Sequence, residues 1–451
     1  MVDAYALSAT TPAARSAARR WLWLGVSALI VAGLFAILLV LSRTPGVQAI
    51  IPWVDFFRTA LVVHVDMSVF IWFVAFAGVL WSVTLPLGTR LNTLALLLCA
   101  AGGLLMAVLP FAGVGAPLMN NYLPVLQHPA FLLALAIIGA GFGLLTIDAL
   151  GGGLRWRTPF TPADALRFGS LTAALAAALT LLVFLWTLRE LPTTLDAHGY
   201  YEFLFWGAGH VLQFTHTQLL ILCWLVLGCA AGLAIGLAPR TVIVLFALGI
   251  APLLYVPILA LQYPVLSGES RLGYTRLMQY GNGIASVPLG LYLLWRILRD
   301  RPVLTPEQRP LRNALYSSLL LFAAGGIIAL LIEGVNVVIP AHYHGSIVGV
   351  TLAFMGTAYY LLPKIGFPAP VSRLARWQPG IYGGGQLLHI LGLAWSGGYG
   401  VQRKTAGAAQ QLERLPEIAG MAMMGLGGLI AVIGGLLFVI VMLRALVWRR
   451  G

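Results

Sequence analysis

The chain has 451 residues, of which 60% are hydrophobic and only 9% are charged. So few charges could not solvate a water-soluble protein of this length, so the composition excludes that class and favours an integral membrane protein. The formal net charge of +13 does not predict a nucleic-acid partner, because Arg and Lys lie in short gaps between apolar runs, where they set topology in membrane lipid.

Apolar runs of about 20 residues, each long enough to cross a hydrocarbon core as a helix, recur along the whole sequence. They predict an all-α, polytopic membrane bundle of about twelve transmembrane helices, forming a single domain over 21–451 after an N-terminal tail, 1–20. The expected spans are 21–42, 57–83, 92–114, 130–150, 168–188, 203–236, 241–262, 276–297, 312–334, 338–363, 380–397 and 419–446.

The distribution of basic residues predicts the orientation of these spans. Gaps after even-numbered spans are rich in Arg, whereas gaps after odd-numbered spans hold most of the acids. The positive-inside rule then places both termini in the cytoplasm of a bacterial or archaeal-type plasma membrane. The pair Arg403–Lys404 is the exception, because it falls on the outer side.

Histidines inside the predicted spans are the best candidates for chemistry. A polar ring is costly in hydrocarbon unless it is hydrogen-bonded or bound to a metal. For any one of them the alternative is an interhelical hydrogen bond without catalytic meaning. Six of the eight histidines fall inside spans: His64, His210, His216, His342, His344 and His389.

The sequence AHYHG, at Ala341–Gly345, places two of these histidines on one helix. Successive residues turn by about 100° on a helix, so His342 and His344 project in directions about 200° apart. One helix could therefore ligate a metal on each side of itself. The three cysteines lie in apolar runs without CxxCH spacing, which argues against covalently attached haem.

Four stretches resemble subunit I of the haem–copper oxidase superfamily, which includes cytochrome c oxidases and nitric oxide reductases. IPAHYHGSIVGVTLAFMGTAYYLLP (Ile339–Pro363) is similar to the tenth span of that family, and LVVHVDMSVFIWF (Leu61–Phe73) to the second. FWGAGHVLQF (Phe205–Phe214) resembles the sixth span, and HILGLAWSGGYGVQRKTAG (His389–Gly407) resembles the end of the eleventh.

The resemblance implies two haems, which we expect to be b-type. His64 and His344 would be the axial ligands of a low-spin haem, and His342 the proximal ligand of a high-spin haem with an open face. Arg403 and Lys404 would bind haem propionates, which would explain their place on the outer side; contact with phospholipid head groups is the alternative.

The second metal of the family, copper or non-haem iron, is where this sequence departs from the pattern. The resemblance assigns His210 to that metal. The His-His pair of the seventh span should fall near Gln262–Pro264, but no histidine occurs between His216 and His342. A lone imidazole makes a poor metal site. Gln262, Tyr263, His216 or a partner subunit could complete it; otherwise His210 would be a hydrogen-bond donor above the haem iron.

Two further positions bear on the chemistry. Phe214 stands where non-haem-iron reductases have a glutamate and also where some oxidases have a cross-linked tyrosine, so Tyr255 or Tyr263 would have to supply a redox phenol. Asp66, two residues after His64, is either a polar contact between helices or a residue of a proton path.

The resemblance therefore predicts a respiratory terminal oxidase subunit, an oxidoreductase with His342 and His210 at its catalytic site. Electrons would come from cytochrome c or a second, electron-donating subunit, and oxygen would be the acceptor. Nitric oxide reduction is the alternative. A different class, a non-catalytic dihaem electron carrier or gas sensor without the second metal, is also compatible with the missing histidines.

Overall fold

The computed structural model describes residues 5–41, 56–154, 160–403 and 412–447. These residues are almost entirely helical, with one short β-hairpin. The chain divides into two compact units. We call Ala4–Leu222 with Ile235–Arg299 the N-terminal unit, and Cys223–Ala234 with Asp300–Gly451 the C-terminal unit. The division falls within helix α7.

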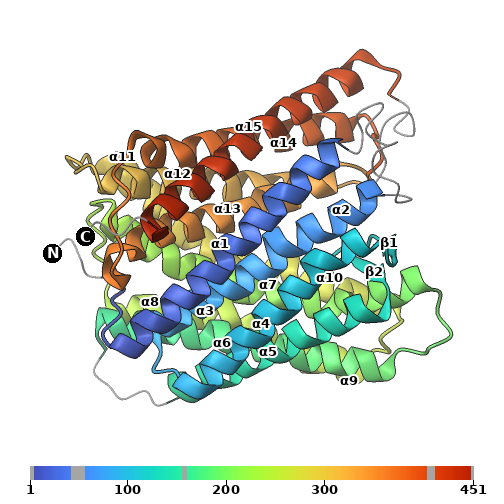
Figure 1. Cartoon of the computed structure of the whole chain (residues 1–451), viewed down its shortest axis with the longest axis horizontal. Helices are drawn as coiled ribbons and strands as arrows, with labels where there is room; N and C mark the ends of the chain where they lie inside the picture. Colours follow the sequence, from blue (N-terminus) through green and yellow to red (C-terminus); the bar gives the residue numbers. More distant parts are fainter. Residues whose placement is uncertain (1–4, 42–55, 155–159, 404–411, 448–451) are drawn as a thin grey trace. The chain divides into compact units, whose positions relative to one another are not determined.

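The N-terminal unit contains most of the helices (Figure 1). In this unit α1 runs alongside α3 and α4, and α4 packs on α5. Its helices are α1 (Pro12–Leu41), α2 (Phe56–Val65), the π-helix η2 (Asp66–Ile71), α3 (Trp72–Thr84), α4 (Thr89–Val108), η3 (Leu109–Ala112), α5 (Pro129–Gly153), α6 (Pro162–Glu190), most of α7 (Ala197–Ala230), α8 (Pro239–Ile250), η4 (Ala251–Tyr255), α9 (Val256–Gln262), α10 (Gly268–Gly281) and α11 (Gly283–Arg299).

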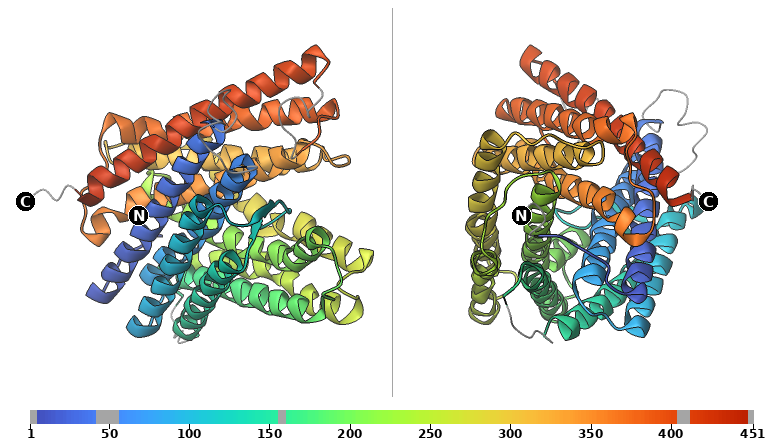
Figure 2. Two further views of the ribbon diagram at one scale, coloured as in Figure 1. Left: turned by 45° about the vertical axis from the view of Figure 1, so that its right-hand side comes forward. Right: turned by 90° about the vertical axis from the view of Figure 1, so that its left-hand side faces the viewer.

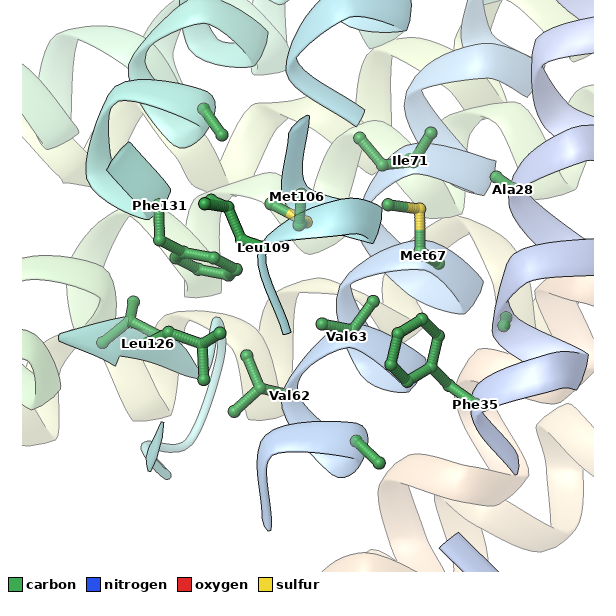
Figure 3. Close-up of a cluster of buried hydrophobic side chains, with 14 of the residues drawn as sticks. Ala28, Phe35, Val62, Val63, Met67, Ile71, Met106, Leu109, Leu126 and Phe131 are labelled. Carbon is green, nitrogen blue, oxygen red and sulfur yellow. The ribbon is translucent and has the colours of Figure 1, made fainter. Parts of the chain in front are cut away.

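A two-stranded antiparallel hairpin joins α4 to α5. Strand β1 (Ala116–Leu118) pairs with β2 (Val125–Gln127), with Pro117 opposite Leu126. Leu126 is fully buried, so the hairpin packs onto the helices. Figure 3 shows it beside the apolar cluster that joins α1, α2, η2, α4, η3 and α5 through Phe35, Val62, Val63, Met67, Ile71, Met106, Leu109 and Phe131.

Four long helices form most of the C-terminal unit: α12 (Gln308–Ala329), α13 (Val338–Leu361), α14 (Arg373–Gly398) and α15 (Leu415–Val447), with the short η5 (Pro363–Ile365) after α13. Figure 2 shows α14 and α15 side by side. Glycines allow close approach, as is common between membrane helices. A Cβ on Gly345 of α13 would lie 2.6 Å from the Gly325 Cα atom of α12, and one on Gly392 of α14 would lie 2.5 Å from the Gly420 carbonyl oxygen of α15.

Ten helical segments of the described residues are long and apolar enough to cross a membrane. Large apolar side chains such as Leu104, Ile147 and Leu436 are exposed on them, as expected of surfaces that contact lipid. The chain is thus an all-α polytopic membrane protein. The ten are Pro12–Leu39, Phe56–Thr84, Thr89–Ala112, Pro129–Gly153, Pro162–Glu190, Ala197–Ala230, Pro239–Gln262, Gln308–Ala329, Val338–Leu361 and Leu415–Val447.

The two remaining expected spans differ from that description. Residues 276–297 are divided between α10, of 14 residues, and α11, of 17 residues, which meet at Asn282, and neither helix is among the ten. Residues 380–397 lie in α14, a 26-residue helix that is not among the ten. The segment 1–20, expected to be a tail, already contains the start of α1 at Pro12.

Candidate functional site

His64 lies in the last turn of α2, directly before the π-helix η2. Its Nδ1 atom lies 2.8 Å from the Ala32 carbonyl oxygen of α1. Because a carbonyl oxygen only accepts hydrogen bonds, Nδ1 must carry the proton, and in the neutral ring Nε2 then presents a lone pair. The ring of His64 is thus oriented by a neighbouring helix.

Asp66 opens the π-helical turn and is fully buried. Neither of its carboxyl oxygens has a hydrogen-bond partner among the described residues. The expected alternative of a polar contact between helices is therefore not observed in this part of the chain. A buried, unpaired carboxylate is costly, so the group requires a proton, water or a bound ligand.

His210, on α7, is 2% exposed, and its Nδ1 donates to the Trp206 carbonyl oxygen 2.7 Å away, one turn earlier on the same helix. Tyr122 of the β1–β2 hairpin packs on it, with 5.1 Å between the ring centroids. The Gln213 amide Nε2 donates to the Tyr122 hydroxyl oxygen at 3.3 Å. The Tyr122 ring also covers Gly209, which has no room for a Cβ atom. The hairpin thus supplies the phenol that lies beside His210.

Polar contacts hold Tyr122 in this position. The Asn120 side-chain oxygen accepts from the backbone N–H of Tyr122 at 2.9 Å and of Leu123 at 2.8 Å. Glu202 accepts from the backbone and side chain of Asn121 and lies 3.5 Å from Arg271. Burial raises the pKa of the Tyr122 phenol well above its usual range. Tyr122 begins the segment YLPVLQHP, but nothing in the sequence predicted that its ring would contact His210.

The other residues proposed near the second metal have different surroundings. The His216 ring contacts the Phe73 ring edge-on, with 4.5 Å between centroids. Tyr255 is 41% exposed, Gln262 is exposed, and Tyr263 lines a small pocket together with Trp206, Arg271 and others. The described residues contain no group of three or more His, Cys, Asp or Glu side chains that could hold a metal ion.

In the C-terminal unit, His342 lies where α13 crosses α12. Its Nδ1 lies 2.8 Å from the Gly325 carbonyl oxygen, so the same argument gives an Nδ1–H ring with an unprotonated Nε2. The crossing is tight because Gly325 and Gly345 are in contact. A larger side chain at either glycine would move the carbonyl that orients the His342 ring.

His344 and His389 come together in the C-terminal unit. Their ring centroids are 5.0 Å apart, at an interplanar angle of 54°. The His344 ring also stacks on Tyr343, with 5.0 Å between centroids. The His389 Nδ1 lies 3.0 Å from the Met424 carbonyl oxygen of α15.

Arg403 follows α14 and lies at the same end of the unit as His342. The backbone N–H of Val337, just before α13, donates to the Val401 carbonyl oxygen at 3.0 Å. The Arg403 Nε atom is buried and has no hydrogen-bond partner among the described residues. An unpaired guanidinium nitrogen near the histidines fits an anionic group such as a haem propionate. Lys404 lies outside the described residues.

Comparison with known proteins finds relatives whose functions have no description. No family model matches the chain. An uncharacterized protein of Rickettsia prowazekii is 30% identical over 97% of both chains. An uncharacterized protein of Aquifex aeolicus is 26% identical over 80% of this chain and 88% of its own length.

Proposed function

This chain belongs to the same family as the Rickettsia prowazekii protein, and we propose that it is a membrane oxidoreductase that binds two haems. The proposal follows the resemblance to subunit I of the haem–copper oxidases, with a bundle of about twelve membrane helices if α14 and the α10–α11 segment also lie in the membrane. It assigns reduction of a diatomic gas to the site that contains His342.

The observation that carries this proposal is the environment of His342. Histidines that bind metals nearly always donate the second ring N–H to a carbonyl or carboxylate, which fixes the ring and makes the ligating nitrogen more basic. His342 donates in this way to Gly325 of a neighbouring helix. His64 donates in the same way to Ala32. In a neutral ring this hydrogen bond leaves Nε2 with a lone pair that can bind iron.

Haem iron with one histidine keeps an open position for a gas, whereas haem iron with two is saturated and suits electron transfer. We assign His342 to the first type, and His64 with His344 to the second. His64 and His344 belong to different units, and their pairing rests on the sequence resemblance. Arg403, with its unpaired Nε, would hold a propionate, and Lys404 would do the same.

His210 is assigned to a second metal, copper or non-haem iron. Its Nδ1 is occupied by the Trp206 carbonyl, so a neutral ring offers Nε2 as a lone pair and not as an N–H. This favours a metal ligand over the alternative of a hydrogen-bond donor above the haem iron. The other ligands would come from side chains of other types, water or a partner subunit.

Oxygen is our first choice of substrate, with electrons from cytochrome c or a second subunit. Phe214 in place of a cross-linked tyrosine favours nitric oxide reduction as the second candidate. Among the described residues, no three side chains of His, Cys, Asp or Glu lie together in a way that could hold a metal ion. This favours the third candidate, an electron carrier or gas sensor with two haems.

The test is haem and metal analysis of the purified protein, with optical spectra of the reduced form with and without carbon monoxide. Two haems b, one of which binds carbon monoxide, with stoichiometric copper or iron would support a gas reductase. Two haems without a second metal would favour the carrier or sensor. A protein without haem would refute the proposal.

A further inference from the structure

His389 has no role in the function proposed above, but its ring is held firmly. It lies on α14, and its Nδ1–H donates to the Met424 carbonyl of α15 at 3.0 Å. The two helices are close enough for a Cβ on Gly428 to lie 3.3 Å from that Nδ1 atom. Because Nδ1 carries the proton, the Nε2 atom of a neutral His389 ring can only accept a hydrogen bond.

The neighbouring His344 ring has the complementary requirement. If His344 binds iron through Nε2, its proton is on Nδ1, and that N–H needs an acceptor. A hydrogen bond of about 2.9 Å between two imidazole nitrogens, plus about 1.1 Å from each nitrogen to its ring centre, separates the centroids by about 5.1 Å. The observed separation is 5.0 Å.

We propose that His389 is a positioning residue for His344: its Nε2 accepts the Nδ1–H of His344, while its own Nδ1–H donates to the Met424 carbonyl. This chain of two hydrogen bonds would fix the orientation of the His344 ring and make its Nε2 a stronger donor to iron. The inference rests on the proposed function, because it takes His344 to be a haem ligand.

A more basic ligand stabilises ferric iron, so losing the acceptor should raise the midpoint potential of the low-spin haem. We expect His389→Leu, which removes the acceptor at similar size, to change the ratio of reduced to oxidised haem at fixed potential about tenfold, or about 59 mV for one electron. His389→Gln can place a carbonyl oxygen near the former Nε2 and should keep the potential close to that of the wild type.

The measurement is a potentiometric titration of the low-spin haem, with its electron paramagnetic resonance spectrum, in the purified full-length protein. Leu387→Ala is the control, because Leu387 lies two residues before His389 and packs on an apolar cluster that includes Ile390, but offers no hydrogen bond. A shift in His389→Leu, rescue in His389→Gln and no shift in Leu387→Ala would support the inference.

Four results would overturn it while leaving the proposed function intact. An unchanged midpoint potential of the low-spin haem in His389→Leu would show that the His389 ring accepts no hydrogen bond from His344. An equal shift in His389→Gln, or in Leu387→Ala, would show an effect of packing alone. Loss of the low-spin spectrum in both His389 variants would make His389 itself the ligand. A wild-type protein without haem would instead refute the proposed function.

Discussion

His342 of the C-terminal unit and His210 of the N-terminal unit are oriented in different ways. In the C-terminal unit the carbonyls that orient His342 and His389 belong to neighbouring helices, at Gly325 and Met424. In the N-terminal unit the carbonyl that orients His210 lies one turn earlier on the same helix, and the other contact comes from the β1–β2 hairpin. The orientation of His342 therefore depends on helix packing, as does that of His64 in the N-terminal unit, whereas His210 is held by its own helix and by a loop.

The largest effect should come from removing the ligand assigned to the gas-binding haem. His342→Ala is expected to abolish carbon monoxide binding and to halve the haem content, because no second protein ligand is assigned to that iron. The measurement is haem content and the carbon monoxide difference spectrum. His216→Ala, which removes a ring packed on Phe73, should keep both signals. Full carbon monoxide binding in His342→Ala would contradict the assignment.

The next effect tests the dependence on helix packing. Gly345→Val would place a side chain against Gly325, where even a Cβ lies 2.6 Å from the Gly325 Cα atom. Overpacking of this kind costs about 1–3 kcal/mol and would move the carbonyl that orients His342. We expect a lower melting temperature and weaker carbon monoxide binding, measured in detergent.

Gly326→Val is the matched control, because the neighbouring Gly326 has nothing within 4 Å of an added Cβ. It should leave stability and carbon monoxide binding nearly unchanged. Equal losses in the two variants would show that the effect does not come from the crossing of α12 with α13.

A third prediction concerns Asp66, which is buried and unpaired in the N-terminal unit. Asp66→Leu removes the burial cost of the carboxyl group and should raise the free energy of unfolding by about 1–3 kcal/mol. If Asp66 carries protons, turnover should fall in the same variant although haem content is unchanged. Thermal unfolding and turnover measure the two effects, and a rise in stability with full turnover would exclude a proton-path role.

The smallest expected effect concerns the hairpin. Tyr122→Phe loses one hydrogen bond from Gln213, worth about 0.5–1.5 kcal/mol. Burial raises the pKa of Tyr122 in the folded state. In the unfolded state the phenol has a pKa of about 10, so above that pH the unfolded chain loses a proton that the folded protein still keeps. The wild type should therefore lose stability as the pH rises above about 10, and Tyr122→Phe should lose less. Parallel pH dependence in the two proteins would contradict this account.

Ten of the twelve expected spans were predictable from composition, because a membrane helix must be long and apolar. The histidines were chosen as candidates because a polar ring inside such a helix is costly. The break at Asn282 between α10 and α11 was not predicted. The dipeptide Asn282–Gly283 is a common turn signal, but the mostly apolar stretch after it favoured one continuous span.

The sequence by itself determined that this is a helical membrane protein, and it indicated His64, His210, His342 and His344 as candidate metal ligands. Only the tertiary structure brought Tyr122 to His210 and His389 to His344, and only it supplied the carbonyls of Ala32, Gly325 and Met424. These five contacts join residues that lie 17 to 88 positions apart in the chain. Helical periodicity describes neighbours within a few turns, so contacts over such separations are decided by the packing of one helix or loop on another.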